Sequence, residues 1–185
     1  AARELATRLA ERGHSVLALH GELEQREREE VLLRFANRSC ALLVATDVAA
    51  RGLDIKDMPV VINYDMAMPA DVHLHRIGRT GRAGDKGMAW TLCRHDERHR
   101  TLAIEELQGT PLNWQTAAPA SGAAKPLMAG MVTLIIDGGR QDKLRPGDLL
   151  GALTGDAGLA ADSIGKIDIY ATRAYVAINR RSADQ

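Results

Sequence analysis

Arginine and glycine alternate in one short stretch of the sequence, which reads His-Arg-Ile-Gly-Arg-Thr-Gly-Arg-Ala-Gly over residues 75–84. Arginine recurs at every third position from Arg76, and glycine does so from Gly78. A guanidinium group keeps its charge and its planar fork matches phosphate oxygens, while glycine lets a backbone approach a ligand closely. The alternative is a solvated basic loop. The spacing favours a site for a phosphate chain, especially one that gains charge as a bond breaks.

A second polar stretch follows an apolar run and reads Val-Ala-Thr-Asp-Val-Ala-Ala-Arg-Gly-Leu-Asp-Ile over residues 44–55. Thr46 would stand at the carboxyl end of a strand, where ligand sites form in α/β folds. Its hydroxyl, and the backbone amides near Gly52, can donate to phosphate oxygens. The alternative for Thr46 is the N-cap of a short helix, and Asp47 and Arg51 are expected to brace the loop.

The two stretches resemble motifs VI and V of the DEAD-box RNA helicases. In that family they lie on the second of two RecA-like lobes, and ATP and RNA bind across the cleft between the lobes. The resemblance implies that Arg79 and Arg82 are arginine fingers at the γ-phosphate, and that His75 and Arg76 complete the catalytic set by orienting that site. It implies ATP and Mg²⁺ as cofactors, with Mg²⁺ held mainly by the first lobe and Asp54 bound to the ATP ribose.

The resemblance also implies contacts with RNA phosphates, which read backbone shape and not sequence. Thr46 and Gly52 would supply them, and Gly52 also belongs to the expected ATP site. Residues 20–28 resemble motif IVa, in which Gln25 and Arg28 share one helix face at spacing i, i+3 and support the phosphate site. The alternative is a surface helix with charge pairs such as Glu24–Arg28.

The composition limits the other possibilities. The chain of 185 residues has zero net charge and 3% aromatic residues, so any nucleic-acid site must be local. Two cysteines and no long apolar run favour a reduced, cytoplasmic protein with no membrane partner. His73-x-His75 has superficial zinc spacing, but no cysteine pair accompanies it and no metal site is expected.

Strands and helices alternate over residues 1–108, and the strands are almost continuously apolar, which predicts an α/β lobe with a parallel sheet. Helices are expected at 2–12, 25–37, 69–77 and 95–107, and strands at 16–19, 41–45, 60–64 and 88–93. The family's lobe opens with a strand that is expected to be absent here. The 185 residues contain neither Gly-x-x-x-x-Gly-Lys-Ser/Thr nor Asp-Glu-Ala-Asp. This chain alone is therefore expected to be inactive towards ATP.

Residues 109–126 are rich in Ala, Pro, Gly and Ser and are expected to form a linker, with Leu112 and Trp114 docking on the lobe. Residues 127–185 then predict the order β-α-β-β, with strands at 131–136, 164–170 and 174–178 and a helix at 146–153. That order matches an RRM-like α+β domain without its last helix and strand.

Residues 136–153 resemble the RNA-binding domain of the bacterial DbpA-type helicases, which implies anchoring on a hairpin of large-subunit ribosomal RNA and a role in large-subunit assembly. The expected RNA-binding residues of this domain are Arg140, Lys143, Arg145 and Tyr175. Two alternatives remain: another DEAD-box helicase, of the degradosome or cold-shock type, and a non-catalytic RNA-binding module.

Overall fold

The structure is a computed structural model that describes residues 1–50, 55, 58–81, 87–117 and 124–183. The described residues divide into two compact units, one drawn from 1–52 and 123–185 and the other from 53–122. Each unit is described by itself below. Among the described residues, no helix is long and apolar enough to cross a membrane.

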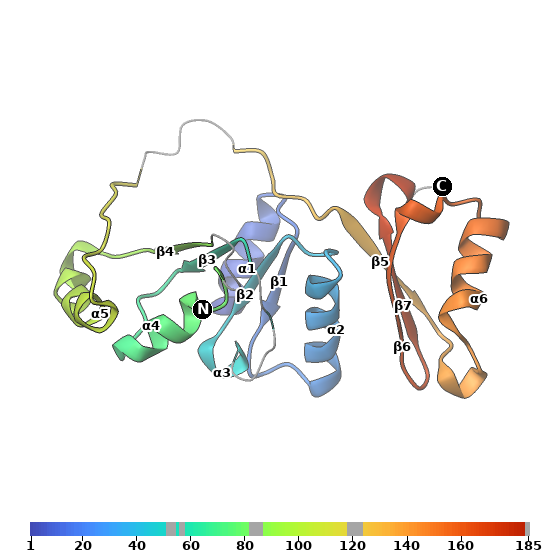
Figure 1. The fold of residues 1–185 in the computed structure, drawn as a ribbon, viewed down its shortest axis with the longest axis horizontal. Coiled ribbons are helices and arrows are strands. Elements are labelled where there is room, and N and C mark those ends of the chain that lie inside the picture. The colour runs from blue at the N-terminus through green and yellow to red at the C-terminus, as the bar shows by residue number, and fades with distance from the viewer. Residues whose placement is uncertain (51–54, 56–57, 82–86, 118–123, 184–185) are drawn as a thin grey trace. The chain divides into compact units, whose positions relative to one another are not determined.

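The first unit begins with a two-stranded parallel sheet (Figure 1). Its elements are α1 (Ala2–Glu11), β1 (Val16–Leu19), α2 (Gln25–Ala36), β2 (Leu42–Ala45) and α3 (Asp47–Ala50). Val16 pairs with Leu42, and the register continues to Leu19 and Ala45. Both α1 and α2 pack against β1, and Leu19 is fully buried. Apolar strands covered by helices are the arrangement that the sequence pattern predicted.

The second unit repeats this arrangement with another parallel pair of strands. Its elements are β3 (Val60–Asn63), α4 (Ala70–Ile77), β4 (Met88–Thr91) and α5 (Thr101–Gln108). The helix expected at 95–107 is divided, because His95–Arg100 forms a 3₁₀ helix before α5 begins. Gly109 ends α5 with a left-handed φ of 67°, a conformation that glycine adopts without strain.

The segment after α5 docks on this unit, as the sequence predicted. The Leu112 amide donates a 2.8 Å hydrogen bond to Oε1 of Glu105. The Arg98 guanidinium lies 4.8 Å from the centre of the Trp114 ring, a cation–π contact. These contacts fix the first residues of the expected linker to α5 and its 3₁₀ turn.

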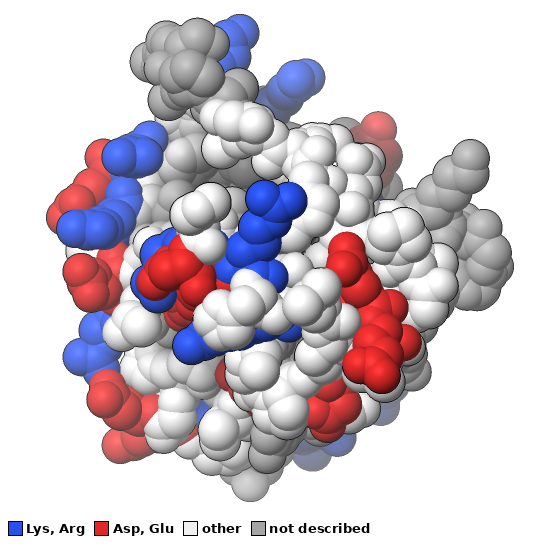
Figure 2. Space-filling view, turned by 90° about the vertical axis from the view of Figure 1, so that its left-hand side faces the viewer, with Lys and Arg blue, Asp and Glu red and all other residues white. Residues whose placement is uncertain are grey.

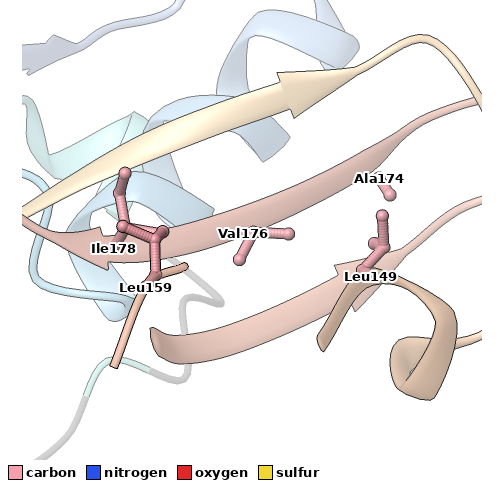
Figure 3. Close-up of a cluster of buried hydrophobic side chains, with 5 residues drawn as sticks. All are labelled: Leu149, Leu159, Ala174, Val176 and Ile178. Atoms are coloured by element: carbon pink, nitrogen blue, oxygen red, sulfur yellow. The ribbon is translucent and has the colours of Figure 1, made fainter. Parts of the chain in front are cut away.

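The small domain has an antiparallel sheet in the order β5-β7-β6. Its elements are β5 (Met131–Ile136), α6 (Pro146–Gly151), a π-helical turn (Ala152–Asp156), β6 (Ile164–Ile169) and β7 (Ala174–Asn179). Every second residue of β7 points into one core, where Ala174, Val176 and Ile178 meet Leu149 and Leu159 (Figure 3). The β-α-β-β order expected from the sequence is present.

Hydrogen bonds join the start of the small domain to residues just before β1 and just after α2 in the same unit. The Ser15 amide donates to the Leu127 carbonyl at 2.8 Å, and the Leu127 amide donates to Nδ1 of His14 at 3.0 Å. Further along, Nδ2 of Asn37 donates to the Thr133 hydroxyl at 3.0 Å. The segment before β5 is therefore bound by both backbone and side-chain contacts.

One glycine determines the course of the basic loop after β5. The backbone of Gly139 lies so close to the β6–β7 turn that a Cβ would stand 2.4 Å from the Tyr170 carbonyl oxygen and 2.5 Å from that of Ala171. The next amides, of Arg140 and Gln141, donate to these carbonyls at 2.9 and 3.0 Å. Only a residue without a side chain permits this approach.

We expect Gly139→Ala to lower the free energy of unfolding of the small domain by about 1–3 kcal/mol, because backbone must move to relieve the clash. Denaturant unfolding followed by circular dichroism measures the loss. Gly147→Ala is the matched control, since a Cβ there meets nothing within 4 Å. Equal stability of the two variants would contradict the close approach at Gly139.

Candidate nucleotide and RNA site

Thr46 lies between the carboxyl end of β2 and the start of α3. Its amide donates to the Leu19 carbonyl at 3.1 Å, which ties it to the neighbouring strand. Its hydroxyl accepts a 3.4 Å hydrogen bond from the amide of Ala49. The N-cap that was the alternative for Thr46 is therefore present. A cap uses only one lone pair of the hydroxyl, so the same group can still donate to a phosphate.

Arg28 extends from α2 towards α3 and not along its own helix. Nη2 of Arg28 donates a 3.1 Å hydrogen bond to the carbonyl of Ala49, which is fully buried. Gln25 instead donates to Oε1 of Glu29 at 2.8 Å. Arg28 thereby stabilises the short helix that Thr46 caps. The alternative, an ion pair between Glu24 and Arg28, is not seen among the described residues.

A buried amide connects three elements of the second unit. Asn63, at the end of β3, is 2% exposed. Its Nδ2 donates to the Thr91 hydroxyl on β4 at 3.0 Å and lies 3.4 Å from Nδ1 of His73 on α4. Its Oδ1 accepts a 3.3 Å hydrogen bond from Nη1 of Arg76. Buried polar groups are costly unless each is paired, so this network fixes α4 on the sheet.

The network positions the start of the arginine-rich stretch. Arg76 also donates to the carbonyl of Asp65 at 2.8 Å. After α4 ends, the Met58 amide donates to the carbonyl of Arg79 at 3.2 Å, and the Thr80 hydroxyl donates to the carbonyl of Met58. The backbone around Arg79 is thus held on both sides, while the His75 side chain is exposed.

Sequence reasoning did not select Asn63, His73 or Thr91 for this network. A signal was available, since Asn63 and Thr91 are polar residues at the ends of apolar strands. Their pairing required the register of β3 with β4, which aligns the two residues directly. Gly52, Asp54 and Arg82, which the sequence assigned to the nucleotide and RNA sites, lie outside the described residues.

The basic loop of the small domain presents its charges to solvent. Arg140, Lys143 and Arg145 are all exposed, and Lys143 adopts a left-handed φ of 61°. The Arg145 amide donates to Oδ2 of Asp148 at 2.9 Å, which caps α6. The structure therefore brings the three expected cations together on one loop that is held at both ends.

Tyr175 is buried, whereas the sequence predicted a residue that binds RNA. It is only 6% exposed, on the middle strand β7, with Ile135 and Asp168 as its neighbours on β5 and β6. Its ring meets that of Tyr170 edge to face, with the centroids 5.7 Å apart. A ring buried in this way offers no face on which a base can stack. Tyr170 is 43% exposed, and sequence reasoning did not select it.

Charges of both signs are interspersed over the face shown in Figure 2. The small domain is also balanced, with seven Lys and Arg against seven Asp over residues 127–185. Binding to a polyanion must then depend on a few placed side chains. In the described part of the chain, no group of three His, Cys, Asp or Glu residues could hold a metal ion.

Comparisons with known proteins find matches for the helicase lobe and for the small domain. Residues 2–84 match the helicase conserved C-terminal domain, and residues 133–185 match the DbpA RNA-binding domain. The ATP-dependent RNA helicase DbpA of Escherichia coli is 52% identical over 175 residues, which are 95% of this chain and 38% of that protein. The crystal structure of the E. coli DEAD-box protein SrmB, at 38% identity and a TM-score of 0.60, matches 67% of this chain and 75% of the other.

This chain belongs to the DEAD-box RNA helicases. Within them it is a C-terminal region of the DbpA type, because one relative matches both the lobe and the RNA-binding domain. Human DDX42, another ATP-dependent RNA helicase, is 56% identical over 91 residues, which are 49% of this chain and 10% of that protein. A DEAD-box protein of Methanococcus jannaschii has a TM-score of 0.56 at 39% identity, over 60% of this chain and 30% of that one.

The buried histidine makes the stability of this DEAD-box lobe depend on pH. Burial lowers the pKa of His73 from its ordinary value of 6.5, and the nearby charge of Arg76 lowers it further. Below that ordinary value the unfolded chain binds a proton that the folded chain does not. Linkage then requires the free energy of unfolding to fall as the pH falls from about 6.5 towards the lowered folded pKa.

We expect His73→Gln to reduce this pH dependence, because glutamine does not titrate and can still accept a hydrogen bond. Urea midpoints at pH 7.5 and pH 5.5 measure the dependence. His75→Gln is the matched control, since that side chain is exposed on the same helix and should leave the slope unchanged. A His73→Gln protein with the full pH dependence of the parent would exclude His73 as its source.

Proposed function

We propose that this chain is the C-terminal portion of an ATP-dependent RNA helicase that acts on ribosomal RNA during large-subunit assembly in the cytoplasm. The observation that carries the proposal is the 52% identity to E. coli DbpA across 95% of the chain. The chain spans 38% of that relative's length, so the whole enzyme needs further sequence. The second RecA-like lobe would supply arginines and RNA contacts, and the first lobe would hold most of the nucleotide.

In this proposal, Arg79 and Arg82 neutralise charge that develops on the γ-phosphate when the lobes close on ATP and RNA. Arg76 and His75 orient the site from α4, and the hydrogen bond that Arg76 donates to Asn63 supports that role. ATP, when bound, supplies the phosphoanhydride that is cleaved. Asp54 and Gly52 would contact the nucleotide, while Mg²⁺ would be held mainly by the first lobe.

RNA binding in the lobe would use backbone contacts. Thr46 and Gly52 would donate to phosphates, with Gln25 and Arg28 in support. The hydrogen bond from Arg28 to Ala49 favours this arrangement, because it holds the helix that Thr46 caps. Phosphate contacts position the RNA without distinguishing bases.

Selection of a ribosomal hairpin would then belong to residues 127–185. The match to the DbpA RNA-binding domain supports this assignment, and so do the three exposed cations on the loop after β5. Because the domain has no net charge, its preference would come from placed contacts, and its affinity would change little with salt.

We expect Arg79→Ala and Arg82→Ala, each in an enzyme that carries both lobes, to lower kcat for ATP hydrolysis by about 10³-fold. Affinity for RNA should change little, since each guanidinium would act on charge that appears in the transition state. RNA-stimulated phosphate release and RNA binding measure the two effects. Arg8→Ala is the matched control, because Arg8 lies on α1 and pairs there with exposed Glu4. A variant that keeps more than about a tenth of kcat is incompatible with an arginine finger.

Deletion of residues 127–185 from the two-lobed enzyme should remove its preference for a ribosomal hairpin substrate over random duplex. Stimulation of ATP hydrolysis by excess nonspecific RNA should survive, because the lobe contacts phosphates. Steady-state ATPase assays with both RNAs test this. If the truncated enzyme still prefers the hairpin, its RNA specificity lies outside residues 127–185.

A further inference from the structure

The carboxamide of Asn63 can be oriented in only one way among its three partners. It is almost fully buried, and Nη1 of Arg76 stands 3.3 Å from one of its two polar atoms. A guanidinium group has donors and no acceptor, so that atom must be the oxygen. The nitrogen then faces the Thr91 hydroxyl at 3.0 Å and Nδ1 of His73 at 3.4 Å.

This orientation determines the protonation state of His73. An amide nitrogen only donates, so Nδ1 of His73 must be an unprotonated acceptor and the ring proton must lie on Nε2. The His73 ring is therefore neutral while Asn63 accepts from Arg76. Burial favours the same form, because a charged imidazole loses hydration in the interior and the His73 side chain is buried.

Protonation of His73 is incompatible with this arrangement. Both nitrogens of an imidazolium donate, so Nδ1–H would face the amide hydrogens of Asn63. A half-turn of the carboxamide gives His73 an acceptor, but it turns the amide nitrogen towards Arg76, which also only donates. Arg76 keeps its charge at every pH at which proteins fold. His73 and Arg76 therefore compete for one oxygen atom.

Arg76 connects this competition to the arginine-rich stretch. It lies in the last turn of α4 and also donates to the carbonyl of Asp65, just after β3, at 2.8 Å. Shortly after α4 ends, the carbonyl of Arg79 accepts the Met58 amide at 3.2 Å. A weaker hold on Arg76 therefore changes how firmly α4 is fixed to β3 at the point where the backbone continues to Arg79.

The charged groups around His73 come from the elements that pack with α4. These are β3 and α5, and β4 contributes the uncharged Thr91 (Figure 1). Burial lowers the pKa of His73 below its ordinary 6.5, and the charge of Arg76 lowers that pKa further. His73 therefore takes up a proton only on the acid side of pH 6.5. The other titratable residues on α4, on α5 and just after β3 are Asp65, Asp71, His75, Glu105 and Glu106.

We propose that Asn63 is a positioning residue whose oxygen holds Arg76 only while His73 is uncharged, so that protonation of His73 releases Arg76 and slows ATP hydrolysis. The proton comes from the solvent and binds Nδ1 of His73. Asn63 and His73 act through Arg76 and take no part in the bond that breaks. The inference rests on the proposed helicase function and adds a pH-sensitive device to its second lobe.

The first test follows RNA-stimulated ATP hydrolysis by the two-lobed enzyme between pH 8.0 and pH 5.5. The parental kcat should fall about 10-fold on acidification, which corresponds to loss of one hydrogen bond to a charged group, while affinity for RNA stays constant. His73→Gln should lack this part of the fall, because glutamine does not titrate and can still accept from Asn63. The ratio of parental to variant kcat at each pH removes the contribution of groups that both enzymes share.

His95→Gln is the matched control, because His95 is an exposed histidine of the same unit. This variant should retain the parental pH profile. Circular dichroism of each variant at both ends of the pH range confirms that the enzyme is folded where its kcat is measured.

Asn63→Asp is the sharper variant. A carboxylate accepts on both oxygens, so it can hold Arg76 and a protonated His73 at the same time. The acid fall in kcat that depends on His73 should therefore disappear although the histidine is retained. If this variant fails to fold, the comparison of His73→Gln with the parent still decides the question.

Nitrogen-15 NMR of the 185-residue chain tests the contact without any need for ATP hydrolysis. The side-chain amide signals of Asn63 should shift with the same midpoint as the ring of His73. In His73→Gln that shift should be lost. A purely structural role of Asn63 predicts signals that do not move until the chain unfolds.

The outcomes separate this inference from the proposed function. If His73→Gln keeps the full parental fall in kcat, or if the Asn63 signals do not follow His73, the pH-sensitive device is wrong and the helicase function stands. If acidification weakens RNA binding and leaves kcat constant, the proposed role of Arg76 in the device is wrong. A two-lobed enzyme that hydrolyses no ATP at any pH overturns both the device and the proposed function.

Discussion

The hydrogen bonds of the buried Asn63 amide are the constraint on which the arginine-bearing part of the lobe depends. The amide joins β3, β4 and α4 in one network, with Thr91, His73 and Arg76 as partners. Each partner is partly or wholly removed from water, so loss of one would leave another unsatisfied. The network restricts the position of α4, and the backbone contacts at Arg79 begin directly after that helix ends.

The small domain uses a comparable constraint with a different chemistry. The absence of a side chain at Gly139 lets the loop approach the β6–β7 turn, and backbone hydrogen bonds then hold Arg140 beside Tyr170. At the other end of the loop, Asp148 accepts the amide of Arg145. This loop is held at both ends. Its cationic side chains therefore lose less conformational entropy when they bind a ligand than those on a free loop would.

A protein with zero net charge depends on side chains at fixed positions to bind a charged ligand. A strongly basic protein attracts any polyanion over its whole surface, whereas a balanced one needs contacts at defined positions. The lobe holds Thr46 and Arg28 in place around α3, and the small domain presents three exposed cations on one loop.

The sequence alone determined the order of elements and the class of chemistry. Apolar runs and their periods located the strands at 16–19 and 131–136 with the bounds that the structure has, because side-chain period follows backbone geometry. Motif spacing identified the family, which the comparisons confirmed. The divided helix after His95 was not predicted, since the apolar spacing there is compatible with either helix type.

Only the tertiary structure decided which polar and aromatic side chains are available. Alternation along β7 placed Tyr175 opposite the core, but it did not reveal that the tyrosine is also covered there. Likewise, the place of Asn63 at the end of an apolar strand did not reveal its partners, because the pairing with His73 depends on strand register and on the position of α4. Local sequence fixes which face of an element a residue occupies, whereas its exposure and its partners depend on segments that are distant in the chain.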